Sequence, residues 1–167
     1  MNVTLIGMPG CGKSTIGVIL AKDMGYHFID VDLVIQEEEG CLLRDIIARE
    51  GIDGFCRVEN RVNAALTAER SIIAPGGSVI YGQEAMEHLR ALGPVVYIRL
   101  SCEEVESRLG DLAKRGVAVR EGQTFRDLYR ERCPLYEKYA DMTVDADGLS
   151  LGDTMRRIEE ALQKYSG

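Results

Sequence analysis

One glycine-rich stretch near the start of the chain limits the folds that are available to the whole sequence. Residues 7–15 read Gly-Met-Pro-Gly-Cys-Gly-Lys-Ser-Thr, directly after the apolar residues 3–6 and directly before an amphipathic segment. The stretch matches G-x-x-x-x-G-K-[ST], a pattern in which a phosphate-binding loop (P-loop) joins a strand to a helix. A glycine-rich turn without a ligand would also fit this stretch, but Lys13 and Ser14 would then follow the glycines only by coincidence. The motif therefore predicts a nucleoside triphosphate site.

The residue types of this loop suit an anion. Glycines lack a Cβ atom, so successive backbone N–H groups can turn toward one phosphate, and the following helix adds unpaired N–H groups and its positive dipole end. Lys13 would contact the outer phosphates and Ser14 would ligate Mg²⁺. We expect ATP to contact the second half of the motif, namely Gly10, Cys11, Gly12, Lys13, Ser14 and Thr15.

The length and composition indicate one globular domain over residues 1–167. Hydrophobic residues make up 46% of the chain and charged residues 28%, which is enough for a core of its own. No apolar run approaches the ~20 residues of a membrane-spanning helix, and no basic leader precedes the first apolar run. The formal net charge of -7 argues against nucleic acids and anionic membranes as partners. We expect a cytoplasmic monomer that binds small molecules.

Strand-like and helix-like segments alternate along the chain. Short apolar runs, separated by segments with helical spacing, cover residues 3–6, 26–32, 71–74, 95–100 and 142–145. This alternation is typical of a parallel α/β sheet covered by helices on both faces. Because ligands bind at the carboxyl ends of such strands, we expect Asp30 and Asp32 to lie beside the P-loop. Gly76 and Gly77 follow the third run and would let backbone approach the same ligand.

Residues 110–123 differ in character from the rest of the chain. Three glycines punctuate the segment and three cations lie among them: Gly110, Gly116, Gly122, Lys114, Arg115 and Arg120. Glycine hinges and positive charge are typical of a lid that closes over phosphates. An exposed loop would have the same composition, so both interpretations stay open.

These groups together fit the transfer of a phosphoryl group, which needs positioning and charge neutralisation more than covalent chemistry. Lys13 and the loop N–H groups would hold the phosphates, while Ser14 and Asp30 would hold Mg²⁺, the latter through water. Asp32 would orient or deprotonate an acceptor hydroxyl. Its unperturbed pKa of ~3.9 makes it a weak base, which favours orientation. Alternatively, both aspartates cap nearby turns.

Several elements also occur together in one order and spacing. They are the loop ending in Gly12-Lys13-Ser14-Thr15, Asp30-Val31-Asp32, Phe55 through Glu59, Gly76 and Gly77, the lid arginine, and Arg132-Cys133-Pro134-Leu135-Tyr136. In these elements the chain resembles the shikimate kinase family over essentially its full length. The resemblance implies a fold similar to nucleoside monophosphate kinases, with a five-stranded parallel sheet in the order 2-3-1-4-5. It implies transfer of phosphate from ATP to the 3-hydroxyl of shikimate, in the shikimate pathway of aromatic amino acid biosynthesis.

The resemblance also implies roles for single residues. On the acceptor side, within about residues 32–62 and beyond, Asp32 would contact the hydroxyls, Gly76 and Gly77 would approach the acceptor, and Arg132 would pair with its carboxylate. On the nucleotide side, Arg115 would be the lid arginine that closes over the phosphates, and it would act in catalysis together with Lys13. Arg108 and Asp145 would lie at the adenine base. Arginine suits both phosphate and carboxylate because its planar fork donates two hydrogen bonds. Arg115 and Arg132 would alternatively be solvated surface charges.

The chain departs from the family pattern at the acceptor side. An arginine that grips the shikimate carboxylate normally follows the phenylalanine, and here that position is Cys56. Arg57 is the candidate to take over this contact, but one residue along a helix turns the side chain by ~100°. In addition, Pro75 replaces the first glycine of a triplet, and Gly116 replaces the proline after the lid arginine.

These departures leave three alternatives open beside a shikimate kinase. The first is an enzyme of the same kind that phosphorylates a different hydroxy acid or a hydroxy amino acid. The second is a nucleotide-binding switch without phosphotransfer, which would need neither Asp32 nor Arg132. The third is a nucleoside monophosphate kinase, although the short acceptor region offers no evident pocket for a base.

Overall fold

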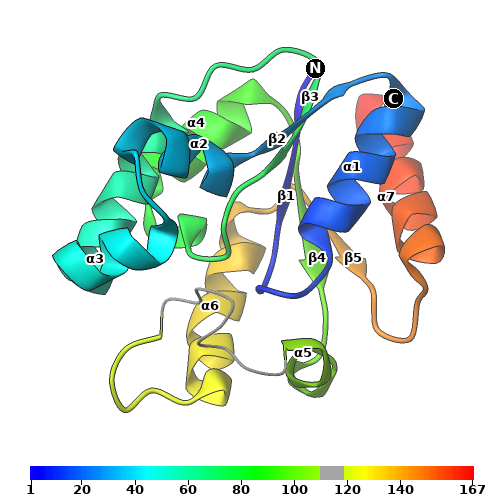
Figure 1. Cartoon of the computed structure of the whole chain (residues 1–167). Coiled ribbons are helices and arrows are strands. Elements are labelled where there is room, and N and C mark those ends of the chain that lie inside the picture. The colour runs from blue at the N-terminus through cyan, green and yellow to red at the C-terminus, as the bar shows by residue number, and fades with distance from the viewer. Residues whose placement is uncertain (110–118) are drawn as a thin grey trace.

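The computed structural model describes residues 1–109 and 119–167. Its five strands form one parallel sheet in the order β2-β3-β1-β4-β5 (Figure 1). The strands are β1 Val3–Ile6, β2 His27–Asp30, β3 Ser71–Ala74, β4 Val95–Arg99 and β5 Met142–Asp145. This arrangement confirms the predicted fold class and strand order.

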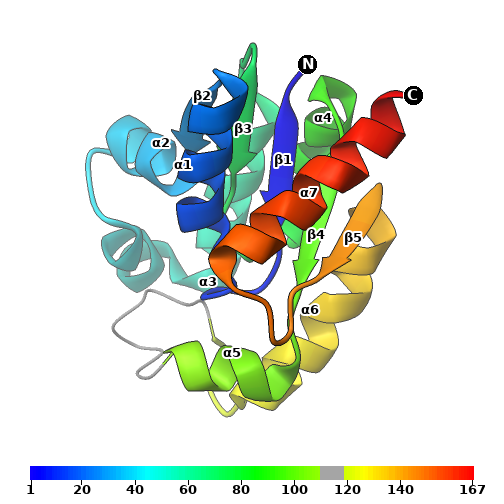
Figure 2. The same cartoon turned by 90° about the vertical axis from the view of Figure 1, so that its right-hand side faces the viewer.

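Helices cover both faces of the sheet. They are α1 Lys13–Met24, α2 Val31–Glu39, α3 Leu43–Ala64, the 3₁₀ helix η1 Val79–Tyr81, α4 Gln83–Leu92, α5 Cys102–Leu109, α6 Phe125–Tyr139 and α7 Leu151–Ser166. Helices α1 and α7 lie side by side on one face, while α4 and α6 pack on the other with α3 against α4 (Figures 1 and 2). Among the described residues, no helix combines the length and apolarity that a membrane span requires.

The central strands are largely apolar runs because both faces of the sheet are covered there. All residues of β1 and β3 are buried, and Val95 and Val96 of β4 are fully buried. Strands buried on both faces lose the alternation of polar and apolar residues that a half-exposed sheet shows. The core therefore lies along the central strands, and their carboxyl ends open toward the loops that carry the polar motifs.

The second strand is shorter than the apolar run over residues 26–32 predicts. β2 ends at Asp30, and Val31 and Asp32 already belong to α2. The cause is the side chain of Asp30, whose Oδ1 accepts a hydrogen bond of 3.0 Å from the backbone N–H of Asp32 and caps the helix. Asp30 therefore marks the end of the strand, and Asp32 lies in the first turn of the helix that follows.

The helical region after β2 breaks at two glycines. Gly40 ends α2 with φ 67°, and Gly51 interrupts α3 with φ 72° and ψ 177°. The part of α3 beyond Gly51 turns Phe55, Glu59 and Val62 into the protein. This second half of α3 carries the acceptor-side motif toward the end of β3.

The predicted lid falls largely outside the described residues. Residues 110–118, which include Arg115 and Gly116, are not among them. In the remaining part, Arg120 forms an ion pair with Asp53 of α3, with 2.7 Å between Nη2 and Oδ1. The end of the predicted lid segment therefore contacts the acceptor-side helix.

Candidate active site

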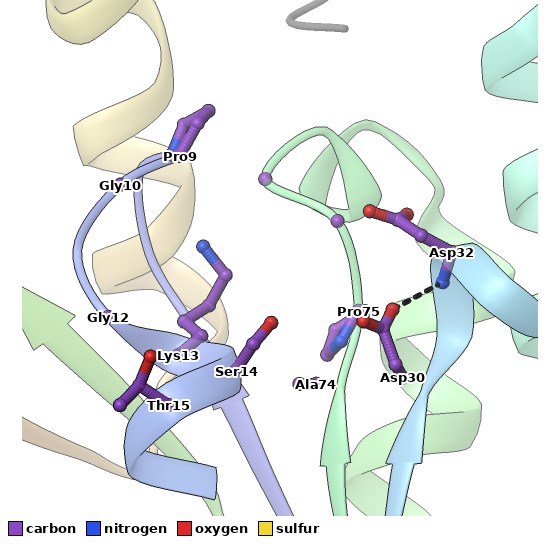
Figure 3. A pocket seen from close by; sticks show the side chains of 12 residues that line it. Pro9, Gly10, Gly12, Lys13, Ser14, Thr15, Asp30, Asp32, Ala74 and Pro75 are labelled. Carbon is purple, nitrogen blue, oxygen red and sulfur yellow. Dashed lines mark hydrogen bonds between the residues drawn. The ribbon is translucent and has the colours of Figure 1, made fainter. Parts of the chain in front are cut away.

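A cavity of about 410 Å³ lies between the P-loop and the carboxyl ends of β2 and β3. Its lining brings together most of the residues that the motifs single out: Pro9, Gly10, Gly12, Lys13, Ser14, Thr15, Asp30, Asp32, Ala74, Pro75, Gly76 and Gly77. Lys13 and Ser14 reach toward it from one side, and Asp30 and Asp32 lie on the other (Figure 3). Segments from three separate parts of the sequence thus meet at one site.

The backbone of the P-loop is suited to an anion. Gly10 and Gly12 have φ values of 79° and 94°, a left-handed conformation that side chains with a Cβ rarely adopt. Gly12 is also the N-cap of α1, and no side chain caps this helix. The first N–H groups of α1 are thus left for a ligand, and the positive end of the helix dipole points the same way. This geometry fits the phosphates of ATP.

Lys13 is held inside the loop. Its buried Nζ donates hydrogen bonds to the carbonyl oxygens of Gly7, at 2.8 Å, and Met8, at 3.0 Å, and lies 3.6 Å from the buried Sγ of Cys11. A charged amine held by neutral carbonyls can exchange them for phosphate oxygens, which form stronger, charge-assisted hydrogen bonds. The ammonium therefore lies within the loop, and Lys13 lines the cavity beside it.

Oxygen donors for a magnesium ion flank the same cavity. The hydroxyl of Ser14 is exposed in the first turn of α1, and Asp30 lies opposite with one carboxylate oxygen used as a helix cap. Within residues 1–109 and 119–167, no cluster of three or more His, Cys, Asp or Glu side chains forms a metal cage. An ion bound here would take its other ligands from phosphates and water, which is how Mg²⁺ commonly binds.

Asp32 combines burial with a free oxygen. Its Oδ1 is buried and has no hydrogen-bond partner among the described residues. Burial and, to a smaller extent, the charge of Asp30 raise the pKa of Asp32 to about 6, although the charge of Lys13 acts in the opposite direction. Asp30 forms the helix cap that the alternative interpretation describes, whereas Oδ1 of Asp32 forms no such cap.

Glu59 is a buried acid to which the sequence alone assigned no role, although it ends the element Phe55 through Glu59. Its Oε1 accepts a hydrogen bond of 2.6 Å from Ser78 Oγ, while Oε2 is buried without a partner among the described residues. Burial, with a smaller contribution from the charge of Asp32, raises the pKa of Glu59 to about 7, and this net value includes the opposing effects of the Ser78 hydrogen bond and the Arg132 charge. The available signal was its helical spacing, because Glu59 shares one face with Phe55 and Val62.

Arg132 of α6 is almost fully buried, with 1% of its surface exposed. Its Nε donates to the hydroxyl of Tyr81 at 3.4 Å, and its guanidinium lies over the ring of Tyr81, 5.5 Å from the centroid. Nη1 lies 3.0 Å from the position that a Cβ of Gly77 would take. Tyr136, one turn further along α6, donates a 2.6 Å hydrogen bond to the carbonyl of Gly77. A buried guanidinium beside a cavity wall is well suited to bind a carboxylate.

The structure does not bring Arg57 to the cavity. Arg57 is exposed on α3, and its Nη2 lies 3.5 Å from the position that a Cβ of Gly54 would take. Cys56 is half-buried, and burial together with the charge of Glu59 raises the pKa of its thiol while Arg132 lowers it. The side chain at the position of the expected arginine is thus a neutral thiol near Glu59 and Arg132.

At the nucleotide side, Arg108 and Asp145 are each engaged in ion pairs. Arg108 Nη2 lies 3.0 Å from Glu104 Oε1, and Asp145 pairs with Arg99 through two hydrogen bonds of 2.5 and 2.8 Å. A second cavity of about 220 Å³ lies beside this pair and is lined by Arg99, Leu100, Ser101, Tyr129, Asp145 and Asp147. Asp145 therefore lines this second cavity and is not part of the lining of the P-loop cavity.

Comparison with known proteins identifies relatives over the whole chain. The sequence model of the shikimate kinase family matches residues 9–163. A shikimate kinase of Moorella thermoacetica is 35% identical over 166 residues, which cover 98% of this chain and 95% of the relative. A shikimate kinase of Methylococcus capsulatus is 37% identical, again over 98% of this chain and 93% of the relative.

Solved structures agree with these sequence matches. The shikimate kinase of Acinetobacter baumannii in complex with shikimate superimposes with a TM-score of 0.89 at 30% identity, covering 98% of this chain and 93% of the other. A deoxyadenosine kinase from M. mycoides, at 18% identity and a TM-score of 0.62, shares the fold. The match of the family model and the identities above 30% over nearly complete chains lead to one conclusion: this chain is a kinase that belongs to the shikimate kinase family.

Proposed function

We propose that this kinase transfers phosphate from ATP to a hydroxyl of a small carboxylated metabolite, and that shikimate is the acceptor, giving shikimate 3-phosphate. The observation that carries the proposal is the grouping of Asp32 and Arg132 around the glycine turn opposite the P-loop. Asp32 adjoins Gly76, and Arg132 adjoins Gly77. An aspartate for a hydroxyl and a buried arginine for a carboxylate fit such an acceptor, and the relative from A. baumannii is described as bound to shikimate.

In the proposed reaction, the P-loop N–H groups and Lys13 bind the phosphates of ATP, and Ser14 and, through water, Asp30 would hold Mg²⁺. The ion would neutralise phosphate charge when bound. Asp32 orients the acceptor hydroxyl and receives its proton. With a pKa of about 6, Asp32 is a stronger base than an exposed aspartate. This suits catalysis, since an effective catalytic base has a pKa near the working pH.

The remaining predicted contacts belong to the same proposal. Arg115 would close over the phosphates, and Arg108 and Asp145 would contact the adenine end. Arg57 would reach the acceptor only after its exposed side chain leaves the vicinity of Gly54. We also propose that the chain acts as a cytoplasmic monomer built from one domain, with residues 110–123 as its lid, and light scattering after size-exclusion chromatography would test its oligomeric state.

Cys56 favours a second candidate function, in which the acceptor is a different hydroxy acid or a hydroxy amino acid. A charged hydrogen bond contributes ~1.5–3 kcal/mol, so loss of the family arginine would weaken the binding of a carboxylate by roughly one to two orders of magnitude. The cavity wall also differs at Pro75, which is buried and lines it. A nucleotide-binding switch is less well supported, because such a protein gains nothing from burying Asp32 and Arg132.

Release of ADP over a panel of acceptors tests these proposals. The panel contains shikimate, related hydroxy acids, hydroxy amino acids and nucleoside monophosphates, each measured with the wild type and with Asp32→Asn. Shikimate-dependent ADP release that Asp32→Asn abolishes supports a shikimate kinase. Release with another acceptor alone would assign the second function, and a gain of shikimate turnover in Cys56→Arg would place the difference at that residue.

A further inference from the structure

Tyr81 links the wall of the cavity to the buried arginine of the acceptor side. It ends the 3₁₀ helix η1, which follows the glycine turn at Gly76 and Gly77. Its hydroxyl accepts the 3.4 Å hydrogen bond from Nε of Arg132, and its ring lies under the guanidinium, with 5.5 Å between Cζ and the ring centroid. One side chain thus contacts Arg132 in two different ways.

A third group orients the hydroxyl of Tyr81. Burial raises the pKa of this hydroxyl, the hydrogen bond and charge of Arg132 lower it, and the charge and hydrogen bond of Glu131 raise it. A phenol that donates its proton to Glu131 turns an oxygen lone pair toward Nε of Arg132. Glu131 is itself held, because it accepts a 2.8 Å hydrogen bond from Nε2 of Gln123. The contact between Tyr81 and Arg132 is therefore part of a connected network.

The acceptor side depends strongly on where the guanidinium of Arg132 lies. Of the arginines in residues 1–109 and 119–167, Arg132 is the only buried one, and position 56, where the family pattern has another arginine, carries a thiol. Nη1 of Arg132 adjoins Gly77, which lines the cavity. An arginine side chain has many rotamers, so a guanidinium that is already fixed loses less entropy when it binds a carboxylate.

We propose that Tyr81 is a positioning residue, which holds the guanidinium of Arg132 in place for the carboxylate of the acceptor. The inference rests on the proposed function and assigns a further residue to its acceptor side. The phenol fixes Nε and the ring supports the guanidinium, so that Nη1 stays beside Gly77. Tyr81 is not among the described residues that line the cavity, and it acts on the acceptor through Arg132.

A role in packing alone does not account for this hydroxyl. Tyr81 keeps 38% of its surface exposed, so removal of the hydroxyl takes little from the core. The glycine turn is already attached to α6 by the hydrogen bond from Tyr136 to the carbonyl of Gly77. The hydroxyl of Tyr81 therefore contributes orientation of Arg132 rather than attachment of the turn.

Two variants of Tyr81 and two matched control variants test the inference. Tyr81→Phe removes the hydroxyl and keeps the ring, and Tyr81→Leu removes both. The controls are Tyr26→Phe and Tyr26→Leu, because Tyr26 is a half-buried tyrosine whose ring lies 5.7 Å from the guanidinium of Arg70, and it does not line the P-loop cavity. ADP release is measured against the concentrations of ATP, of the acceptor and of its methyl ester. The acceptor is shikimate or the hydroxy acid that the panel identifies, and the ester lacks the negative charge.

Tyr81→Phe should raise the KM of the acceptor roughly 3- to 10-fold, and Tyr81→Leu should raise it roughly 10- to 100-fold, the range for a charged hydrogen bond. The kcat and the KM of ATP should change little. The methyl ester should show nearly the same kcat/KM in all variants, because it offers no charge to Arg132, and its inhibition constant against the acceptor replaces kcat/KM where its turnover is slow. Both variants of Tyr26 should match the wild type.

The possible failures are distinguishable. An unchanged KM of the acceptor in both variants of Tyr81 would overturn the inference and leave the proposed function intact. Equal losses for the acceptor and its methyl ester, or a parallel rise in the KM of ATP, would show a general structural effect and overturn the inference as well.

If the wild type phosphorylates neither shikimate nor another hydroxy acid, the proposed function fails, and calorimetry with shikimate in the presence of ADP decides the inference. Weaker binding of shikimate by Tyr81→Phe than by the wild type would keep Tyr81 as a positioning residue. Unchanged binding, or no binding to the wild type, would overturn it.

Discussion

Asp32 and Glu59 are the residues in which the chemistry of the site departs most from ordinary side chains. Both are acids that the fold removes from water, and both have raised pKa values for that reason. Asp32 was found from the sequence because it ends an apolar run in a known pattern. Glu59 ends the element Phe55 through Glu59, but its burial was not predicted, because burial of an acid depends on what packs against its helix face, here Ser78 and the turn at Gly76. No local pattern of residue types encodes those partners.

The pKa of Asp32 predicts the pH dependence of turnover. Asp32 accepts a proton only when it is ionised, so kcat/KM for the acceptor should fall about tenfold per pH unit below about 6. Asp32→Asn should lower kcat by roughly 10²- to 10⁴-fold and leave the KM of ATP nearly unchanged. Initial rates between about pH 5 and 8 check both points. A flat profile in the wild type would rule out Asp32 as the titrating group.

The same two acids predict how stability changes with pH. In each case the folded-state pKa lies above the unfolded one, so the folded state binds the proton more tightly. Their contribution to the free energy of unfolding is therefore largest at low pH and is lost as pH rises through about 6 and 7. As pH rises through this range, the free energy of unfolding of the wild type should fall, relative to that of the double variant Asp32→Asn, Glu59→Gln, by on the order of a few kcal/mol.

Urea unfolding of the wild type and the double variant at several pH values between about 4 and 8 measures this difference. The double variant is the control for all other titrating groups, because they are common to both proteins. Parallel stability curves for the two proteins would contradict the raised pKa values.

At the scale of elements, α6 supports the glycine turn that forms one wall of the cavity. Tyr136 is buried and donates its hydroxyl hydrogen bond to the carbonyl of Gly77. Tyr136→Phe should lower the free energy of unfolding by ~1–3 kcal/mol, because it leaves a carbonyl without its partner. It should also raise the KM of the acceptor more than that of ATP. Tyr165→Phe, at the exposed end of α7, is the matched control and should change neither quantity.

The break in α3 gives a second prediction for an element. Gly51 has φ 72° and ψ 177°, a conformation that is essentially restricted to glycine. Gly51→Ala should destabilise the protein by ~1–3 kcal/mol through backbone strain, since no atom within 4 Å would crowd the new Cβ. Gly152→Ala in α7, where the nearest atom lies 3.9 Å away, should instead stabilise by ~0.5–1 kcal/mol. Equal effects in denaturant unfolding would show that the conformation at Gly51 costs nothing.

The elements themselves were largely predictable from local sequence. The apolar runs of the strands, the helix breaks at Gly40 and Gly51 and the start of α7 at Ser150 all follow from short-range signals. The predicted end of β2 at residue 32 was wrong, because the capping preference of Asp30 outweighed the apolar pattern that continues into Val31. Competition of this kind between a cap and a strand is decided by the hydrogen bonds that each one completes.

At the scale of the whole molecule, the order of the strands decides which motifs meet. β1 lies between β3 and β4, so the P-loop after β1 faces the glycine turn after β3 and the aspartates after β2 (Figures 1 and 3). The family resemblance supplied this order, and the residue pattern alone supplied only a parallel sheet. The exposure of Arg57 and the ion pairs of Arg108 and Asp145 could not be predicted, because rotamers and partners depend on contacts distant in sequence.

The central claim is that the P-loop and the acceptor side act together as one phosphotransfer site. Phosphorus NMR of a reaction with ATP, Mg²⁺ and shikimate measures it most directly, since it distinguishes a phosphate monoester from inorganic phosphate. The account predicts that the γ-phosphate appears as a monoester of the acceptor in equal amount to ADP, and that Asp32→Asn suppresses it. Inorganic phosphate as the only product, or unconsumed ATP with every hydroxy acid and hydroxy amino acid offered, would contradict the account.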